Sequence, residues 1–214
     1  MTHFLESAEL YQAFQKAGGF FGARVKAFRD YLDFGGVRRV FDIGCGPGHI
    51  VEYIPKGIEY VGFDTEQRYI DFANRRFGAR GRFLAREFDR SAADEFGRPD
   101  LVLMNGVLHH MNDASARQVI GNAAAALEPG GVFFTLDGCF RKGQNPISRY
   151  LLEHDRGKFV RTAPEYRELV EGAFRGAQVH VRDDLSWVPY TFAIVHARNT
   201  PRYTDARGHA CSGR

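Results

Sequence analysis

Cysteine, long apolar runs and concentrated charge are all scarce in this chain of 214 residues. The three cysteines, Cys45, Cys139 and Cys211, are an odd number at wide spacing, which fits neither a disulfide framework nor a zinc site. No apolar run approaches the roughly 20 residues that span a bilayer, and the opening residues lack the pattern of a signal peptide. We therefore expect a cytoplasmic protein in a reducing compartment, with no metal and no membrane insertion.

Charge of one sign is not gathered in any part of the main body of the chain. Lysine and arginine number 29 against 26 acidic residues, a net charge of +3, and part of the excess lies in residues 198–214. Strong nucleic-acid binders usually carry a clustered basic face. We therefore expect a small-molecule partner and no nucleic acid, while the sequence leaves open whether the protein is a monomer or a homodimer.

Strand-like and helix-like segments alternate along most of the chain. The predicted strands are 37–43, 60–64, 82–88, 101–105, 132–137, 178–182 and 190–197, and the predicted helices include 51–54, 68–77 and 114–127. Residues 101–105 are nearly all apolar, as expected of a parallel strand that is covered on both faces. We expect an α/β fold with a Rossmann-like, doubly wound, mostly parallel sheet of seven strands, an antiparallel edge strand and helices on both faces.

The strongest local signal is the segment Val40–Gly48, which reads Val-Phe-Asp-Ile-Gly-Cys-Gly-Pro-Gly. Gly44 and Gly46 can take positive φ and let the backbone lie against a ligand, while Gly48 lets the next helix begin close to the strand. Asp64 ends the following strand, where a carboxylate can accept hydrogen bonds from both hydroxyls of a ribose. The two features together predict a nucleoside site.

Asp42-x-Gly-x-Gly-x-Gly, the acid Asp64 and the turn Leu-Glu-Pro-Gly-Gly at 127–131 together resemble class I S-adenosylmethionine-dependent methyltransferases, over residues 37–137. The flanking segments 149–152, 155–157 and 188–191 are similar to a group of small bacterial methyltransferases. The resemblance implies S-adenosylmethionine (SAM) as cofactor and S-adenosylhomocysteine as product. It implies that these residues bind the cofactor: Asp42, Gly44, Cys45, Gly46, Asp64, Thr65, Glu87, Phe88, Asn105 and Gly106, with Tyr11 and Arg24 from amino-terminal helices that close over it.

The expected organisation is one methyltransferase domain over residues 1–198. Its predicted parts are a helical cap at 1–36 with a break at Gly18-Gly19, a cofactor-binding core at 37–137, a substrate-side insertion at 138–161 and a last helix with edge strands at 162–198. Thr162 and Glu165 have the spacing of a capping box, which marks the start of that last helix. Residues 199–214 are predicted to be a disordered tail.

Methyl transfer from SAM needs a nucleophile in line with the departing sulfur and a group that removes a proton. Histidine suits proton removal at neutral pH, and His109 and His110 follow a strand on the carboxyl edge of the sheet, where ligands bind. Asp137, at the predicted tip of the next strand, is the third catalytic candidate. Each has a structural alternative, because a histidine can pack or cap a helix and Asp137 can form a turn before Gly138.

The expected function is methyl transfer to an oxygen, or less favourably a nitrogen, of a small metabolite that contacts Arg149, Tyr150 and Arg156. Arg149 and Arg156 could instead form structural ion pairs, for example with Asp155. The alternative functions are a nucleic-acid or protein methyltransferase, a nicotinamide-dependent oxidoreductase and a module that binds SAM without turnover. The segment Asn105-Gly106-Val107-Leu108 lacks the Asn-Pro-Pro-Tyr signature of amine-directed members, and His49 stands where a nicotinamide fingerprint has glycine.

Overall fold

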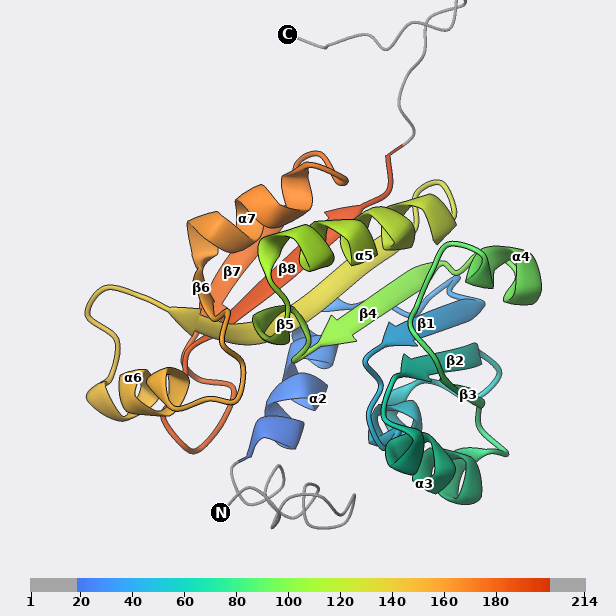
Figure 1. Cartoon of the computed structure of the whole chain (residues 1–214), viewed down its shortest axis with the longest axis horizontal. Coiled ribbons are helices and arrows are strands. Elements are labelled where there is room, and N and C mark those ends of the chain that lie inside the picture. Colours follow the sequence, from blue (N-terminus) through green and yellow to red (C-terminus); the bar gives the residue numbers. More distant parts are fainter. Residues whose placement is uncertain (1–18, 201–214) are drawn as a thin grey trace, which may run out of the picture.

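A computed structural model describes residues 19–200 of the chain (Figure 1). The strands are β1 (Arg39–Ile43), β2 (Glu59–Asp64), β3 (Arg82–Ala85), β4 (Leu101–Asn105), β5 (Val132–Phe140), β6 (Arg161–Thr162), β7 (Gln178–Arg182) and β8 (Phe192–Arg198). The α-helices are α2 (Phe20–Tyr31), α3 (Gln67–Phe77), α4 (Ala92–Phe96), α5 (Asp113–Ala126), α6 (Pro146–Glu153) and α7 (Ala163–Glu171). Two short 3₁₀ helices, η2 (His49–Tyr53) and η3 (Leu108–His110), follow β1 and β4.

The strands form one sheet in the order β3-β2-β1-β4-β5-β8-β7, with β6 beside the end of β5. All pairs from β3 to β5 are parallel, whereas β8 runs antiparallel to both β5 and β7. The predicted doubly wound α/β fold is therefore confirmed, with an eighth strand of two residues added. The chain leaves β1 toward β3 and returns to β4, so the carboxyl ends of β1 and β4 border the crevice where ligands bind in such sheets.

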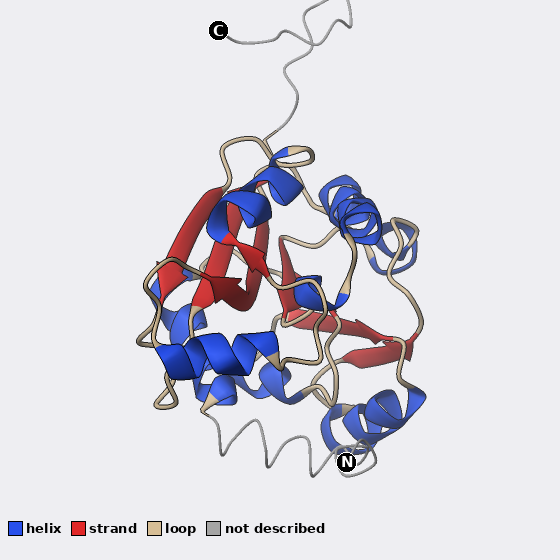
Figure 2. Ribbon diagram, turned by 60° about the vertical axis from the view of Figure 1, so that its left-hand side comes forward, coloured by secondary structure: helices blue, strands red, loops and turns tan. Residues whose placement is uncertain are grey.

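Helices cover both faces of the sheet, as Figures 1 and 2 show. Side chains alternate along each strand, so Val102 and Met104 enter a core with α4, α5 and α7, while Leu101 and Leu103 enter a second core with α2, η2 and α3. This alternation decides which helices face a residue at the end of a strand. Asn105 continues the series of Leu101 and Leu103 and therefore lies on the side of α2.

Several strand boundaries differ from those predicted, and those of β3, β5 and β8 bear on the site. β3 ends at Ala85, because Phe88 leaves the strand and its ring packs 5.2 Å from that of Phe63 in the core. β5 continues to Phe140, because β8 pairs with it as far as Gly138 and β6 pairs with its last two residues. Asp137 therefore lies inside a strand, where it is buried, and does not form a turn. β8 begins at Phe192, two residues later than predicted.

Capping residues explain where several helices begin. Thr162 and Glu165 form the predicted capping box, in which the Glu165 carboxylate accepts hydrogen bonds from the Thr162 backbone and hydroxyl. The insertion contains an unpredicted helix, α6, which begins with Asn145 as its cap and Pro146 in its first turn. Asn145 and Pro146 are local signals for the start of a helix. The polar composition of the surrounding segment predicts an irregular structure instead, so the helix is not predicted from sequence.

The two ends of the described chain bear on two further predictions. α2 begins directly after Gly19, as the glycine break predicts, while the expected helix before it and Tyr11 lie outside the described residues. Asn199 lies in the predicted disordered tail, but its side-chain amide donates hydrogen bonds to the carbonyl oxygens of Ala124, Leu127 and Glu128. Over residues 19–200 no helix is long and apolar enough to cross a membrane.

Candidate active site

The glycine loop after β1 leaves one stretch of backbone open. Gly44 and Gly46 both have positive φ, 71° and 53°. A Cβ on Gly44 would lie 2.4 Å from Val107, so this glycine permits close packing against the segment after β4. A Cβ on Gly46 would meet no atom of residues 19–200 within 4 Å. Gly46 is thus the position of the loop at which a ligand can approach the backbone.

Asp64 at the end of β2 is tied to the glycine loop. Its carboxylate accepts hydrogen bonds from the backbone N–H of Gly46 at 2.8 Å and of Glu66 at 2.9 Å. Burial raises the pKa of Asp64, while these two bonds oppose that shift. The acid predicted to bind a ribose therefore also fixes the loop beside it.

Asp42 lies at the other side of the loop and is almost completely buried. The Tyr60 hydroxyl donates to its Oδ2 over 2.5 Å. Burial raises the pKa of Asp42 to about 7, although the Tyr60 bond and the charge of Arg24 act in the opposite direction. This carboxyl group is therefore half protonated near neutral pH.

The end of β4 presents a buried amide, Asn105, and has Arg24 near the next residue, Gly106. Asn105 is 7% exposed, and within the described part of the chain neither amide atom of its side chain has a hydrogen-bond partner. Arg24, on α2, brings its guanidinium within 3.2 Å of the position that a Cβ on Gly106 would occupy. A buried amide without partners costs about 1–3 kcal/mol, so this site is built for a polar ligand.

The His109 ring is held between two carboxylates. Its Nδ1 lies 2.8 Å from Asp137 Oδ1, and its Nε2 lies 3.5 Å from Asp155 Oδ1. Burial lowers the pKa of His109, but the hydrogen bond and charge of Asp137 and the charge of Asp155 outweigh it, so the pKa is raised overall. An imidazole that faces an acceptor at both nitrogens is best satisfied as a cation.

The His110 ring lies beside that of His109, with ring centroids 4.1 Å apart and ring planes tilted by 42°, but His110 is exposed. Partial burial and the neighbouring His109 lower the pKa of His110, and Arg156 acts in the same direction. The pKa values of the two adjacent histidines are therefore shifted in opposite directions, and the lowered pKa favours the neutral form of His110 at pH 7.

The predicted substrate residues occupy the insertion. Arg149 pairs with Glu153 at 2.9 Å on the surface of α6, in a structural ion pair. Tyr150 is 60% exposed and stacks on His154. Arg156 is exposed and, of the three, is the one close enough to His110 to shift its pKa.

The remaining predicted cofactor residues lie around the loop or beyond β3. Thr65 and Glu87 are exposed, whereas Cys45 is half-buried, and a Cβ on Gly62 would lie 2.7 Å from its sulfur. Phe88 is buried in the core, so its side chain is not available to a ligand. Burial raises the pKa of the Cys45 thiol well above its usual range, which fits a packing role.

Arg161 is a site residue that sequence reasoning missed. It is 7% exposed, and its guanidinium donates to the carbonyl oxygens of Leu108, Met111 and Phe159. It also bonds Asp113 Oδ1 at 2.7 Å. These bonds hold η3, and with it the histidine pair, in place. No local pattern could reveal them, because most of the partners come from a distant part of the chain.

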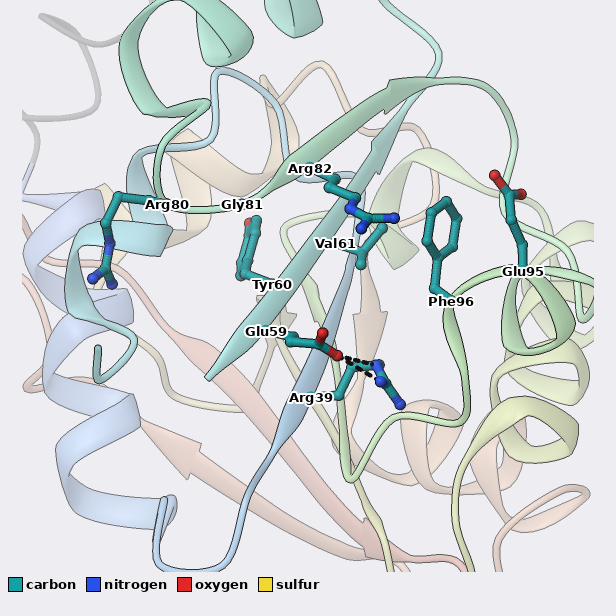
Figure 3. A pocket seen from close by; sticks show the side chains of 9 residues that line it. All are labelled: Arg39, Glu59, Tyr60, Val61, Arg80, Gly81, Arg82, Glu95 and Phe96. Carbon is teal, nitrogen blue, oxygen red and sulfur yellow. Dashed lines mark hydrogen bonds and ion pairs between the residues drawn. The ribbon is translucent and has the colours of Figure 1, made fainter. Parts of the chain in front are cut away.

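A separate cavity of about 280 Å³ lies at the amino ends of β1, β2 and β3, on the edge opposite the glycine loop (Figure 3). Its arginines are engaged, since Arg39 pairs with Glu59 and Arg80 donates to two carbonyl oxygens of the η2 region. Nothing in its lining points to a ligand. Across the described residues, no group of three or more His, Cys, Asp or Glu side chains is arranged to hold a metal ion.

Known proteins resemble the chain in both sequence and structure. Residues 41–133 match the family model described as a methyltransferase domain. The chain is 27% identical to the ubiquinone biosynthesis O-methyltransferase of Vibrio parahaemolyticus, over 75% of this chain and 67% of that protein. It is 29% identical to the 3-hydroxy-5-methyl-1-naphthoate 3-O-methyltransferase of Streptomyces sahachiroi, over 47% of this chain and 30% of that protein.

Among solved structures, human N-acetylserotonin methyltransferase in complex with SAM matches with a TM-score of 0.65 at 19% identity. The match covers 91% of this chain and 55% of the human one. The chain thus spans only part of the length of each of these three relatives.

Proposed function

We propose that the chain is a SAM-dependent methyltransferase, which transfers a methyl group from SAM to an oxygen, less favourably a nitrogen, of a small molecule. The match of residues 41–133 to a methyltransferase domain and the similarity to O-methyltransferases support this proposal. We propose further that residues 1–198 act as one domain, with 138–161 covering the acceptor side. The single observation that carries the proposal is the buried, unpartnered amide of Asn105 at the end of β4, which pairs with the strand that leads into the glycine loop.

The residues at the carboxyl ends of β1, β2 and β4 suit the polar groups of SAM. Arg24 would pair with the methionine carboxylate, and Asp42 with Asn105 would receive the ammonium group. Asp64 has the position and charge to accept the ribose hydroxyls, and Gly46 offers its backbone. Thr65 and Glu87 lie on the side where the adenine would extend.

SAM, when bound, supplies a methyl group on a positively charged sulfur, which is already activated for displacement. The chain then has to orient the acceptor, exclude water and take up one proton. We assign the proton to His110, because it is exposed and its lowered pKa favours the neutral form at pH 7, whereas both nitrogens of His109 face carboxylates. The methyl group would pass to the acceptor oxygen with S-adenosylhomocysteine as the leaving group, and the His110 imidazole would take up the acceptor proton.

The acceptor that these residues favour is a hydroxylated aromatic acid. The hydroxynaphthoate named for one relative carries an aromatic hydroxyl and a carboxylate, and Arg156 beside His110 supplies a charge that would suit such an anion. Calorimetry with SAM and S-adenosylhomocysteine tests the cofactor, and mass spectrometry of hydroxylated aromatic acids incubated with methyl-labelled SAM tests the transfer. Folded protein that binds neither compound would overturn the proposal. Binding without any labelled product would leave a SAM-binding module.

A further inference from the structure

The insertion reaches the histidine pair through residues 155–159. The Phe159 N–H donates to the His109 carbonyl oxygen at 3.0 Å, and the Gly157 N–H donates to Asp155 Oδ1 at 2.7 Å. A Cβ on Gly157 would lie 2.0 Å from His109 Cδ2, so only glycine fits against this ring. The insertion is therefore in close contact with the centre of the proposed site.

Polar side chains from four parts of the fold meet around the His109 ring. Asp137 comes from β5, His109 from η3, Asp155 from the insertion, and Tyr190 from the segment before β8. The Tyr190 hydroxyl lies 3.3 Å from Asp155 Oδ2, and Asp155 Oδ1 lies 3.5 Å from His109 Nε2. Asp155 thus connects Tyr190, which precedes β8, to the ring nitrogen of His109 that Asp137 does not contact.

Resting on the proposed methyl transfer, we propose that Asp155 is a positioning residue for the reaction. Together with Asp137 it holds His109 in one orientation as a cation, and His109 in turn fixes the adjacent His110 ring, whose centroid lies 4.1 Å away, for receipt of the acceptor proton. Tyr190 holds Asp155 in place. The insertion therefore contributes to the geometry of proton transfer as well as to covering the acceptor.

The charges around each ring support this assignment. Asp137 and Asp155 both raise the pKa of His109, against the effects of burial and of Arg24. His110 faces His109 and Arg156, which lower its pKa, and Asp155 and Asp137, which raise it. Loss of the Asp155 charge removes one of the two groups that keep His109 protonated, so the pKa of His109 must fall.

The test compares the full-length protein with Asp155→Asn, Tyr190→Phe and a matched control, Asp183→Asn. Asp183 pairs with Arg141 at the start of the insertion, and this ion pair is exposed on the surface. Imidazole ¹⁵N NMR spectra, recorded in the absence of a methyl acceptor, report the protonation state of each histidine. Methyl transfer from SAM to the hydroxylated aromatic acid that gives turnover in the screen reports kcat, and calorimetry reports the SAM dissociation constant.

We expect His109 of the wild type to stay doubly protonated at pH values above the pKa of a free histidine side chain. Asp155→Asn should lower the pKa of His109. Asp155→Asn and Tyr190→Phe should lower kcat about tenfold or more with the SAM dissociation constant unchanged, because small displacements of reacting groups have large effects on rate. Asp183→Asn should match the wild type in every measurement.

The inference fails if the wild type is active but Asp155→Asn leaves both the His109 titration and kcat as in Asp183→Asn. Tyr190→Phe keeps the Asp155 charge, so it tests the same connection where Asp155→Asn does not fold. Absence of SAM binding and transfer in the folded wild type would instead overturn the proposed function, and the positioning role with it. The two failures are therefore distinguishable in one set of measurements.

Discussion

Tyr60 and Asp42 are joined by a hydrogen bond of 2.5 Å between two neighbouring strands of the sheet. Both side chains are 2% exposed, and the register pairs Tyr60 with Val40 and Asp42 with Gly62. The tyrosine partly offsets the burial of the carboxylate, whose pKa is nevertheless raised to about 7. The acid of the glycine motif is therefore a group that titrates at physiological pH.

This relationship predicts that the affinity for SAM rises with pH through about 7. A cationic ligand favours the ionised form of Asp42, and below its pKa a proton must first be released. Tyr60→Phe removes a bond that lowers the pKa of Asp42, so it should move the transition to higher pH. Calorimetry in two buffers of different ionisation enthalpy should detect proton release on binding. Asp42→Asn is the control that should abolish the pH dependence of SAM affinity. Equal affinity of the wild type for SAM at pH 6 and pH 8 would contradict the prediction.

Alanine substitutions should separate the roles of Gly46 and Gly44. Gly46→Ala should cost about 1–2 kcal/mol of stability from its positive φ and abolish detectable SAM binding, because the new methyl group enters open space beside the loop. Gly44→Ala should cost about 1–3 kcal/mol more stability than Gly46→Ala, since the new methyl group overlaps Val107. Thermal unfolding and calorimetry measure both effects. Val107→Ala in the Gly44→Ala background should restore part of the stability, and no recovery would refute the overlap.

Asp64→Ala should weaken SAM binding about 10²-fold, because it removes a charged acceptor for the ribose and releases the backbone of Gly46. The dissociation constant measured by calorimetry checks this. Asp71→Asn is a suitable control, since Asp71 accepts a hydrogen bond from Gln67 on the exposed side of α3. An Asp64→Ala protein that binds SAM as tightly as the control would remove Asp64 from the site.

Arg161→Met should lower the free energy of unfolding by about 3 kcal/mol or more, since each buried acceptor left without a partner costs about 1–3 kcal/mol. The carbonyl oxygens of Leu108, Met111 and Phe159 lose their donor in this variant. Urea denaturation measures the change. Arg117→Met, which breaks an exposed pair with Glu168, should change stability by less than about 0.5 kcal/mol. Comparable losses in the two variants would argue against a special role for Arg161.

Local patterns made several parts of the protein predictable from sequence. The alternation of apolar runs and helical segments predicts the parallel order of β1 to β5, because side-chain periodicity is a property of neighbouring residues. The positive φ of Gly44 and Gly46 and the capping box at Thr162 and Glu165 are likewise local requirements. These features are enough to predict the fold class and the edge of the sheet to which we assign the cofactor.

By itself, then, the sequence determined the periodicity of the strands, the backbone freedom of the glycine loop and the acid at the end of β2. Only the tertiary structure decided that β8 lies between β5 and β7, that Asp137 is buried within a strand, and that His109 faces Asp155 across the insertion. The pKa shifts of Asp42 and of the two histidines likewise arise from tertiary contacts. The physical reason is that burial and charge depend on groups far apart in the chain, and no local pattern records which of them will meet.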